Sequence, residues 1–363
     1  MLEEIDLHVT NRCTTQCNYC CYQSNRLKLN ELSIEEIRKV LFEAKELGAR
    51  HIHITGGEPL IRKDIFDIVA ICKKMGFFVR MQTNGDLVNQ YIIKELEQVG
   101  LEEIMVSLDS YQEKINDINR GNGEFLKAIN AIKLLLNSKI NVRVNSVITK
   151  QNCKDIYNTI SYLHKLGVKN YSGFYFSPIG SGKKNKELWM NPQEYINFWD
   201  DLTHKLSNTC IINDMNIIVE KGYIKWNECM EIDVSSFSGC GGGCLNNYKK
   251  REYLIIRCDG NVYPCIMSID GEPLGNVFNE SLMEIYNRSI IWEKLKPIGS
   301  NYCAGCDNYN ICVEGCRFFP RLYDDECDYD DRCVYGELIP ICPIMKYNHK
   351  NGKMGGSSDE VIN

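Results

Sequence analysis

Short β-branched runs alternate with segments of helical periodicity between residues 4 and 207 of the 363-residue chain, and this rhythm constrains the fold most. The predicted strands cover residues 4–10, 51–55, 77–83, 103–109, 142–148 and 171–176. Strands that each precede a helix build a parallel sheet with right-handed crossovers. The six units predict an α/β fold whose sheet curls into a partial, TIM-like (β/α)6 barrel, with its chemistry at the C-terminal ends of the strands.

The segments between these runs carry the signals of helix ends. Ser33 and Glu36 have the spacing of a capping box, and Gly48 stands where a C-terminal cap belongs. Further helices are expected near residues 62–75, 89–99, 123–137, 152–166 and 191–207. The rhythm stops after residue 230, where turn-rich sequence with the run SGCGGGC begins. We therefore expect a domain boundary there.

Composition excludes several classes of protein. The net charge of −6 gives no basic face for nucleic acid. No apolar run reaches the roughly 20 residues of a membrane span, and the first residues lack the features of a signal peptide. We expect a cytoplasmic protein that binds neither nucleic acid nor a membrane. In that compartment, 19 cysteines indicate metal or cluster ligation rather than disulfides.

Four cysteines lie in the stretch CTTQCNYCC, residues 13–21, directly after the first predicted strand. Cys13, Cys17 and Cys20 have the spacing C-x3-C-x2-C, and three thiolates on a four-iron cube leave one iron open to a substrate or cofactor. The alternative is a closed zinc site with Cys21 as fourth ligand. Adjacent cysteines rarely reach one metal together, so we expect Cys21 to pack behind the loop.

Glycine-rich or polar tips follow three other predicted strands at the same edge. They are TGGEP (55–59), QTNG (82–85) and SLDS (107–110). Two glycines after a strand expose backbone amides and carbonyls to a ligand, and the proline fixes the exit of the chain. The other two tips also fit an ordinary turn and a helix cap. Together the tips predict a pocket at the mouth of the barrel.

CTTQCNYC followed by TGGEPL resembles the radical S-adenosylmethionine (SAM) superfamily, with Tyr19 at the aromatic position before the third cysteine. The resemblance implies a [4Fe–4S] cluster on Cys13, Cys17 and Cys20. Its open iron chelates SAM, and its electron cleaves the carbon–sulfur bond to give a 5′-deoxyadenosyl radical. The resemblance also implies contacts to the methionine amino group from Gly56, Gly57 and Glu58. It implies contacts near the carboxylate and ribose from Ser107, Arg120 and Asn145.

A second cysteine-rich region follows the expected boundary. Residues 303–316 read CAGCDNYNICVEGC, with the spacing C-x2-C-x5-C-x3-C. Upstream, DGNVYPC predicts a hairpin with a type I′ turn that delivers Cys265. These elements resemble the SPASM extension of radical SAM enzymes, which carries two auxiliary [4Fe–4S] clusters. The resemblance then covers nearly the whole chain to about residue 345.

Carried over residue by residue, the resemblance implies two interleaved ligand sets. The first auxiliary cluster would take Cys240, Cys244, Cys265 and Cys316. The second would take Cys303, Cys306, Cys312 and Cys333. Cys258 and Cys229 are alternatives to Cys240, and Cys327 and Cys342 are alternatives to Cys333. With the N-terminal site, three [4Fe–4S] clusters are expected.

The expected division of the chain follows from these two resemblances. Residues 1–230 would form the radical SAM partial barrel, and residues 231–345 would form the SPASM domain. Residues 346–363 are polar and rich in glycine and serine, which predicts a disordered tail.

Most enzymes with this extension modify a ribosomal peptide or a protein, by oxidation, crosslinking or epimerisation. The resemblance thus implies a peptide-modifying maturase that takes electrons from an external donor such as a flavodoxin or ferredoxin. Many such maturases carry a leader-peptide-binding domain before the barrel, whereas the first strand here is predicted from residue 4, so a separate leader-peptide recognition protein is expected.

Two other functions stay open at this point. One is oxidation of a small sugar-like or cofactor-precursor substrate, and the other is a non-catalytic iron–sulfur electron-transfer protein. The catalytic acid or base is also open, among Asp214, Glu220, Tyr175 and several neighbours.

Overall fold

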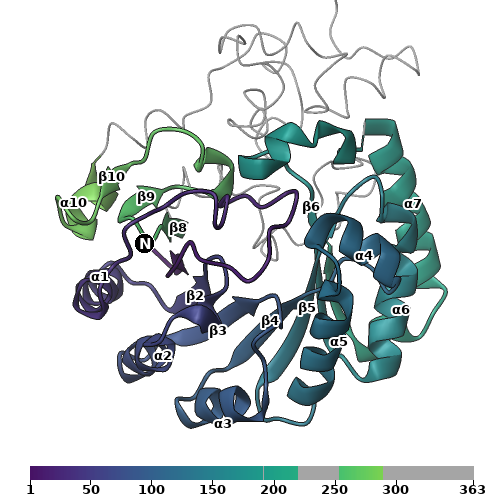
Figure 1. The fold of residues 1–363 in the computed structure, drawn as a ribbon, viewed down its shortest axis with the longest axis horizontal. Helices are drawn as coiled ribbons and strands as arrows, with labels where there is room; N and C mark the ends of the chain where they lie inside the picture. Colours follow the sequence, from purple (N-terminus) through teal and green to yellow (C-terminus); the bar gives the residue numbers. More distant parts are fainter. Residues whose placement is uncertain (191, 220–252, 289–363) are drawn as a thin grey trace, which may run out of the picture.

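The computed structural model describes residues 1–190, 192–219 and 253–288, shown as the coloured ribbon in Figure 1. Its strands are β1 (Glu4–His8), β2 (His51–Thr55), β3 (Phe78–Thr83), β4 (Glu103–Ser107), β5 (Asn141–Ile148), β6 (Asn170–Tyr175), β7 (Asn216–Val219), β8 (Tyr253–Ile256), β9 (Asn261–Tyr263) and β10 (Gly275–Asn276). The first six strands coincide with the six predicted from the sequence, to within three residues at either end.

The strands form one ten-stranded sheet in the order β10-β9-β8-β1-β2-β3-β4-β5-β6-β7. Every neighbouring pair from β8 through β1 to β7 is parallel, and the β8–β9 and β9–β10 pairs are antiparallel. This mixed, mostly parallel sheet confirms the predicted α/β class. Within the described residues β7 and β10 are its two edge strands.

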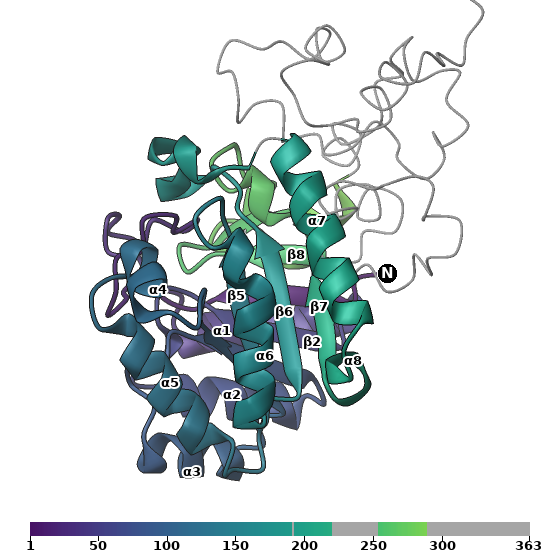
Figure 2. The same ribbon diagram turned by 90° about the vertical axis from the view of Figure 1, so that its right-hand side faces the viewer.

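The helices are α1 (Ile34–Glu46), α2 (Ile65–Lys74), α3 (Gln90–Gln98), α4 (Glu113–Arg120), α5 (Glu124–Leu135), α6 (Ile156–Leu166), α7 (Pro192–Ser207), α8 (Ile211–Asp214) and α10 (Leu282–Asn287). Ser33 and Glu36 form the predicted capping box at the start of α1, and Gly48 follows that helix with φ +101°. Figures 1 and 2 show α1, α2, α3, α5, α6 and α7 arranged along the outer side of the sheet. None of the described helices is long and apolar enough to span a membrane.

Alternation along the strands separates an apolar face from a polar one. In β1, Ile5 and Leu7 are fully buried in the large apolar core under the helices. Since successive side chains of a strand point to opposite faces, Glu4, Asp6 and His8 lie on the inner face of the sheet. The inner face at β1 is therefore lined by polar side chains. Its C-terminal edge is where the cysteine stretch follows β1.

Two features of the fold were not predicted. Helix α4 carries few apolar residues, and three of its polar side chains are buried: Asn116, Asn119 and Arg120. Strand β8 comes from beyond the predicted boundary at residue 230, yet it pairs with β1 in parallel. The described part of the predicted second domain thus continues the sheet formed by β1–β7.

The predicted hairpin is confirmed as β8–β9, but the type I′ turn is wrong. A type I′ turn needs positive φ at both central residues, and here only Gly260 has one, at +79°. The N–H of Gly260 donates to the Arg257 carbonyl at 2.9 Å, and Arg257 pairs with Asn261 across the loop. This is a three-residue loop closed by a glycine bulge, because the glycine comes last rather than in the middle.

Candidate active site at the C-terminal edge of the sheet

Residues 10–25, which we call the cysteine loop, follow β1 at the C-terminal edge of the sheet and bring three thiols together. The Thr15 hydroxyl lies 3.3 Å from Cys13 Sγ and 3.7 Å from Cys17 Sγ. Burial raises the pKa of Cys17 to about 11 and also raises that of Cys13, and the nearby charge of Cys20 adds to both effects. Thiols held this close resist ionisation until a metal neutralises them, so the donor set fits an iron–sulfur cluster.

Cys21 is the fourth cysteine of the cysteine loop. Together with Cys20 it packs against a small apolar cluster, defined by its buried members Tyr22, Ile179, Ile255, Tyr263, Cys265 and Ile269. Burial raises the pKa of its thiol well above the ordinary range. This placement agrees with the expectation that Cys21 packs behind the loop.

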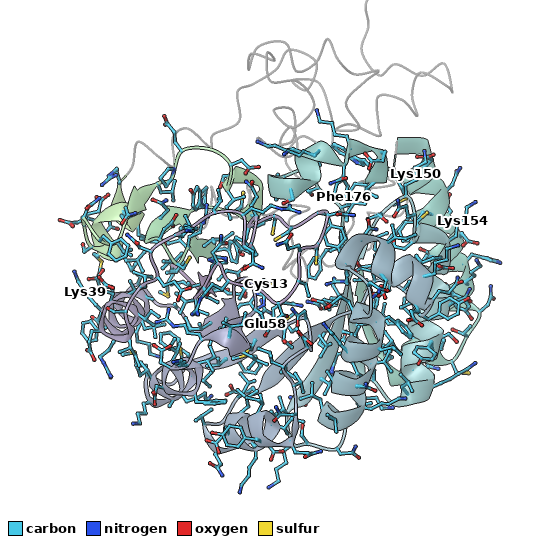
Figure 3. The ribbon with its side chains drawn as sticks, in the orientation of Figure 1. Cys13, Lys39, Glu58, Lys150, Lys154 and Phe176 are labelled. Carbon is cyan, nitrogen blue, oxygen red and sulfur yellow. The ribbon has the colours of Figure 1, made fainter. Side chains whose placement is uncertain are left out.

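The TGGEP tip of β2 is pressed against the start of the cysteine loop. The N–H groups of Gly57 and Glu58 donate to the carbonyls of Thr10 and Arg12, at 2.7 and 2.8 Å. A Cβ on Gly57 would overlap the Arg12 carbonyl and lie 3.0 Å from Cys13 Cβ. The glycine is therefore required for this approach, and Figure 3 shows Cys13 and Glu58 next to each other.

Glu58 is fully buried, and its carboxylate joins the tips of β2 and β3. It accepts hydrogen bonds from the Asn84 N–H at 2.8 Å, the Thr83 hydroxyl at 2.9 Å and the Leu60 N–H at 3.2 Å. Burial raises the pKa of Glu58 to about 7, although these hydrogen bonds oppose the shift. The carboxyl thus changes charge near neutral pH inside the site.

Ser107 and Asn145 meet at the same edge, as paired residues of β4 and β5. Gln82 of β3 joins them, because its amide donates to Ser107 at 2.7 Å and accepts from Asn145 at 2.7 Å. Asn145 Oδ1 is buried and has no hydrogen-bond partner in the described part of the chain. An orphaned acceptor at this edge fits a polar ligand that carries a donor.

Arg120 lies beneath the cysteine loop, where its guanidinium donates to Asp109 at 2.9 Å. The guanidinium also lies over the Tyr19 ring, 5.7 Å from the centroid, and the Tyr19 hydroxyl donates to the same carboxylate. The Arg120 carbonyl accepts from Cys17 Sγ at 3.8 Å. Arg120 Nε is buried without a hydrogen-bond partner among the described residues, so one donor is left for a ligand.

Asp109 is the site residue that the sequence reasoning missed, since Ser107 was the one residue of SLDS expected to contact a ligand. Besides Tyr19 and Arg120, it accepts the Val147 N–H at 2.9 Å, and its own N–H donates to Asn116 at 2.9 Å. It thereby joins the cysteine loop, α4 and β5. Its place between Ser107 and the downstream Arg120 was the signal that could have found it.

A charged network on the inner face of the sheet was also not predicted. His53 Nδ1 lies 2.9 Å from Asp6, and the Tyr253 hydroxyl donates to the same carboxylate. Burial opposes ionisation of Asp6, but these partners outweigh it and hold its pKa below the ordinary value. Arg80 pairs with Glu4. Glu4, Asp6 and His53 thus form one network of polar contacts with Arg80 and Tyr253 on the inner face of the sheet.

The candidates for acid or base have structural partners where they are described. The Tyr175 hydroxyl donates to the Met190 carbonyl at 2.7 Å, and Asp214 pairs with His164 at the surface. Glu220 lies outside the described residues.

Of the predicted auxiliary-cluster ligands and their alternatives, the structure describes only Cys265 and Cys258. Both are buried beside the β8–β9 hairpin. Those outside the described residues are Cys229, Cys240, Cys244, Cys303, Cys306, Cys312, Cys316, Cys327, Cys333 and Cys342. The two ligand sets therefore stay predictions.

Comparison with known proteins gives two domain matches. Residues 7–163 match the Radical SAM superfamily, and residues 244–307 match the SPASM iron–sulfur cluster-binding domain. The AdoMet-dependent heme synthase of Methanosarcina barkeri is 25% identical over 345 residues, covering 90% of this chain and 95% of the relative. Mycofactocin maturase MftC of Mycolicibacterium smegmatis is 23% identical over 361 residues, covering 96% of this chain and 88% of the relative.

Among solved structures, Streptococcus suis SuiB bound to its precursor peptide SuiA shares the fold. The TM-score is 0.71 at 18% identity, over 94% of this chain and 74% of SuiB. The similarity to SuiB concerns the fold alone. The two domain matches, together with the cysteine loop already described, show that the chain belongs to the radical SAM superfamily, carries its SPASM domain, and has SAM and [4Fe–4S] clusters as cofactors.

Proposed function

We propose that the chain is a radical SAM enzyme that modifies a residue of a ribosomal peptide or protein by oxidation, crosslinking or epimerisation. The observation that carries the proposal is the cysteine loop, whose three thiols are held against the TGGEP tip by the Gly57 and Glu58 backbone hydrogen bonds. The similarity to the PqqA peptide cyclase of Granulibacter bethesdensis, which is 24% identical over 355 residues, supports the peptide substrate.

In this proposal Cys13, Cys17 and Cys20 hold the cluster beside the TGGEP tip. When bound there, a [4Fe–4S] cluster supplies the electron that cleaves SAM to methionine and the 5′-deoxyadenosyl radical that abstracts hydrogen from the substrate. The backbone N–H groups of Gly57 and Glu58 already donate within the protein. The Gly56 and Gly57 carbonyls and the Glu58 carboxylate are thus the groups left to accept from the methionine amino group.

Ser107, Asn145 and Arg120 are proposed to contact the SAM carboxylate and ribose. The buried Asn145 Oδ1 and Arg120 Nε, both without a hydrogen-bond partner among the described residues, support this assignment. One is an acceptor and the other a donor, which suits a ligand that carries hydroxyl and carboxylate groups.

We further propose two auxiliary clusters and so three [4Fe–4S] clusters in all. The first would take Cys240, Cys244, Cys265 and Cys316, and the second Cys303, Cys306, Cys312 and Cys333. The barrel would occupy residues 1–230, the SPASM domain 231–345 and a disordered tail 346–363, with β8–β10 as the part of the SPASM domain that extends the sheet. A flavodoxin or ferredoxin would supply electrons, and a separate protein would recognise the leader peptide.

A second candidate function is the oxidation of a cofactor precursor. It is favoured by the similarity to the M. barkeri heme synthase, which spans 90% of this chain. Both candidates use the same radical chemistry and differ only in the substrate.

The chemistry is tested by anaerobic reconstitution and a cleavage assay. We expect about twelve irons per chain and 5′-deoxyadenosine formation that depends on dithionite. Replacing Cys13, Cys17 and Cys20 by alanine should abolish cleavage and leave about two-thirds of the iron. Cleavage by this triple variant would refute the proposal.

The substrate class is tested separately. A short reading frame beside the gene would be translated and the peptide incubated with the holoenzyme and SAM. A mass change in the peptide supports the maturase, whereas an unchanged peptide in a sample that cleaves SAM favours the cofactor-precursor candidate.

A further inference from the structure

Arg257 and His8 are neighbours at the C-terminal ends of β8 and β1. Leu7 pairs with Ile256 in the parallel register, so the next residues on the two strands, His8 and Arg257, lie on the same inner face. Both are deeply buried, with 7% of Arg257 and none of His8 exposed. A buried guanidinium in this position needs a partner for its hydrogen bonds.

The unpaired atoms in this corner are all donors. His8 Nδ1 accepts the Cys258 N–H at 3.4 Å, so the ring proton is on Nε2. Burial, aided by the charge of Arg257, lowers the pKa of His8 to about 3, which keeps the ring neutral. His8 Nε2 and Arg257 Nε and Nη2 have no hydrogen-bond partner in the described part of the chain. Arg257 Nε and Nη2 form the side-on fork of the guanidinium, which binds a carboxylate with two parallel hydrogen bonds.

The nearest described carboxylate does not fill this fork. Asp259 Oδ1 lies 3.9 Å from Arg257 Nε, beyond hydrogen-bond range. Both Asp259 oxygens already accept from Asn261, at 3.3 and 3.1 Å. The Tyr263 hydroxyl also lies near Arg257. Among the described residues, the corner therefore has positive charge and unpaired donors and no carboxylate bonded to the fork, which favours an anion over a cation.

The corner lies beside the cysteine loop, on the side away from the β2 tip. Strand β8 flanks β1 on the side opposite β2, whose tip carries the glycines proposed to bind SAM. The His8 ring lies against the ring of Tyr22 of the cysteine loop, with centroids 4.2 Å apart. A ligand on Arg257 would thus lie beside the loop and apart from the proposed SAM contacts on β2, β4 and β5.

We propose that Arg257, with His8 beside it, binds a carboxylate of the substrate, either an acidic side chain or the C-terminal carboxylate of a peptide. The inference rests on the proposed function and adds a recognition element to it. The bound carboxylate fixes the substrate next to the cysteine loop, so Arg257 determines specificity without taking part in SAM cleavage.

The test measures binding of small probes to the reconstituted holoenzyme by calorimetry or ligand-observed NMR. N-acetyl-aspartate amide offers a side-chain carboxylate, N-acetylglycine offers a terminal one, and N-acetylglycinamide is the neutral control. We expect at least one carboxylate probe to bind and the neutral probe not to bind. The carboxylate probe that binds more tightly shows whether Arg257 recognises an acidic side chain or a C-terminal carboxylate. Arg257→Gln should weaken binding by about tenfold or more. Arg38→Gln, at an exposed arginine of α1, should leave it unchanged.

Arg257→Lys keeps the buried charge and removes the fork, so it separates loss of recognition from loss of folding. We expect a thermal midpoint near that of the wild type with weakened probe binding. Equal binding by the wild type and Arg257→Gln, binding of the neutral probe, or a holoenzyme structure with Asp259 turned onto the fork would each overturn the inference. SAM cleavage is measured in the same samples: its absence in the wild type counts against the proposed function, and normal cleavage with unchanged probe binding counts against this inference alone.

Discussion

Asp109 and Arg120 form a buried ion pair beneath the cysteine loop, with 2% and 10% of their side chains exposed. The pair holds the loop from below, since Tyr19 donates to the same carboxylate and Cys17 donates to the Arg120 carbonyl. Arg120 therefore positions the cysteine loop, whether or not it also contacts a ligand.

Asp109→Asn should destabilise the protein strongly. It removes the carboxylate charge and leaves the Arg120 guanidinium buried without compensation, at a cost of about 3 kcal/mol or more in the free energy of unfolding. Denaturant unfolding under anaerobic conditions measures the loss. The matched control is Asp201→Asn, which breaks the exposed pair with Lys205 and should cost under about 0.5 kcal/mol. Similar losses in the two variants would contradict the role given to Asp109.

Glu58 should make stability depend on pH around neutrality. Its folded pKa of about 7 lies above the ordinary 4.5, so its contribution is complete below 4.5 and is lost as the pH rises through about 7. Without SAM, the stability of the wild type relative to Glu58→Gln should fall by about 2–3 kcal/mol between about pH 5 and about pH 8. The exposed Glu187→Gln should follow the wild type. A flat difference between wild type and Glu58→Gln would show that the Asn84 and Thr83 hydrogen bonds keep the carboxyl ionised.

Gly57→Ala should prevent assembly of the N-terminal cluster. The added methyl group would overlap the Arg12 carbonyl, which is backbone and therefore costly to displace. We expect a loss of about four irons per chain after reconstitution, with no SAM cleavage. Gly271→Ala is the control, because a methyl group there meets only the Ser268 carbonyl at 3.3 Å. Full iron content in Gly57→Ala would show that the loop tolerates a displaced β2 tip.

Cys20→Ala and Cys21→Ala should behave differently although the residues are adjacent. Cys20 is a proposed ligand, so its loss should remove the N-terminal cluster. Cys21 packs behind the loop, and we expect Cys21→Ala to keep the full iron content and the cleavage rate. Iron analysis with electron paramagnetic resonance of the reduced protein distinguishes the two. If Cys21→Ala lost the cluster and Cys20→Ala kept it, Cys21 would be the cluster ligand and Cys20 the packed residue.

Local sequence patterns were sufficient to predict the six parallel strands and the positions of the cysteine loop and the TGGEP tip. Each depends on residues close in sequence: β-branched runs, capping residues and glycines after a strand. Helix α4 was missed because it lacks the apolar stripe that marks a helix in sequence, and its buried Asn116 and Asn119 look like loop residues. Asp109 could be read as a cap because its partners Tyr19 and Arg120 come from other segments.

Long-range pairing was outside the reach of sequence patterns. Nothing near residues 253–256 indicates that this strand pairs with β1, since the pairing joins distant segments through backbone hydrogen bonds that any sequence can make. The neighbourhood of Arg257 and His8 depends wholly on that pairing. The inner-face network of Asp6, His53 and Tyr253 was hidden for the same reason.

The pairing of β8 with β1 also determines when the sheet can finish folding during synthesis of the chain. As the ribosome releases the chain, β1 finds β2 early, but its other edge has no partner until residues 253–256 have emerged. An unpaired edge invites pairing with other chains, and contacts between distant segments form slowly. A truncation before β8 would leave that edge open beside the thiols and should aggregate rather than yield a smaller enzyme.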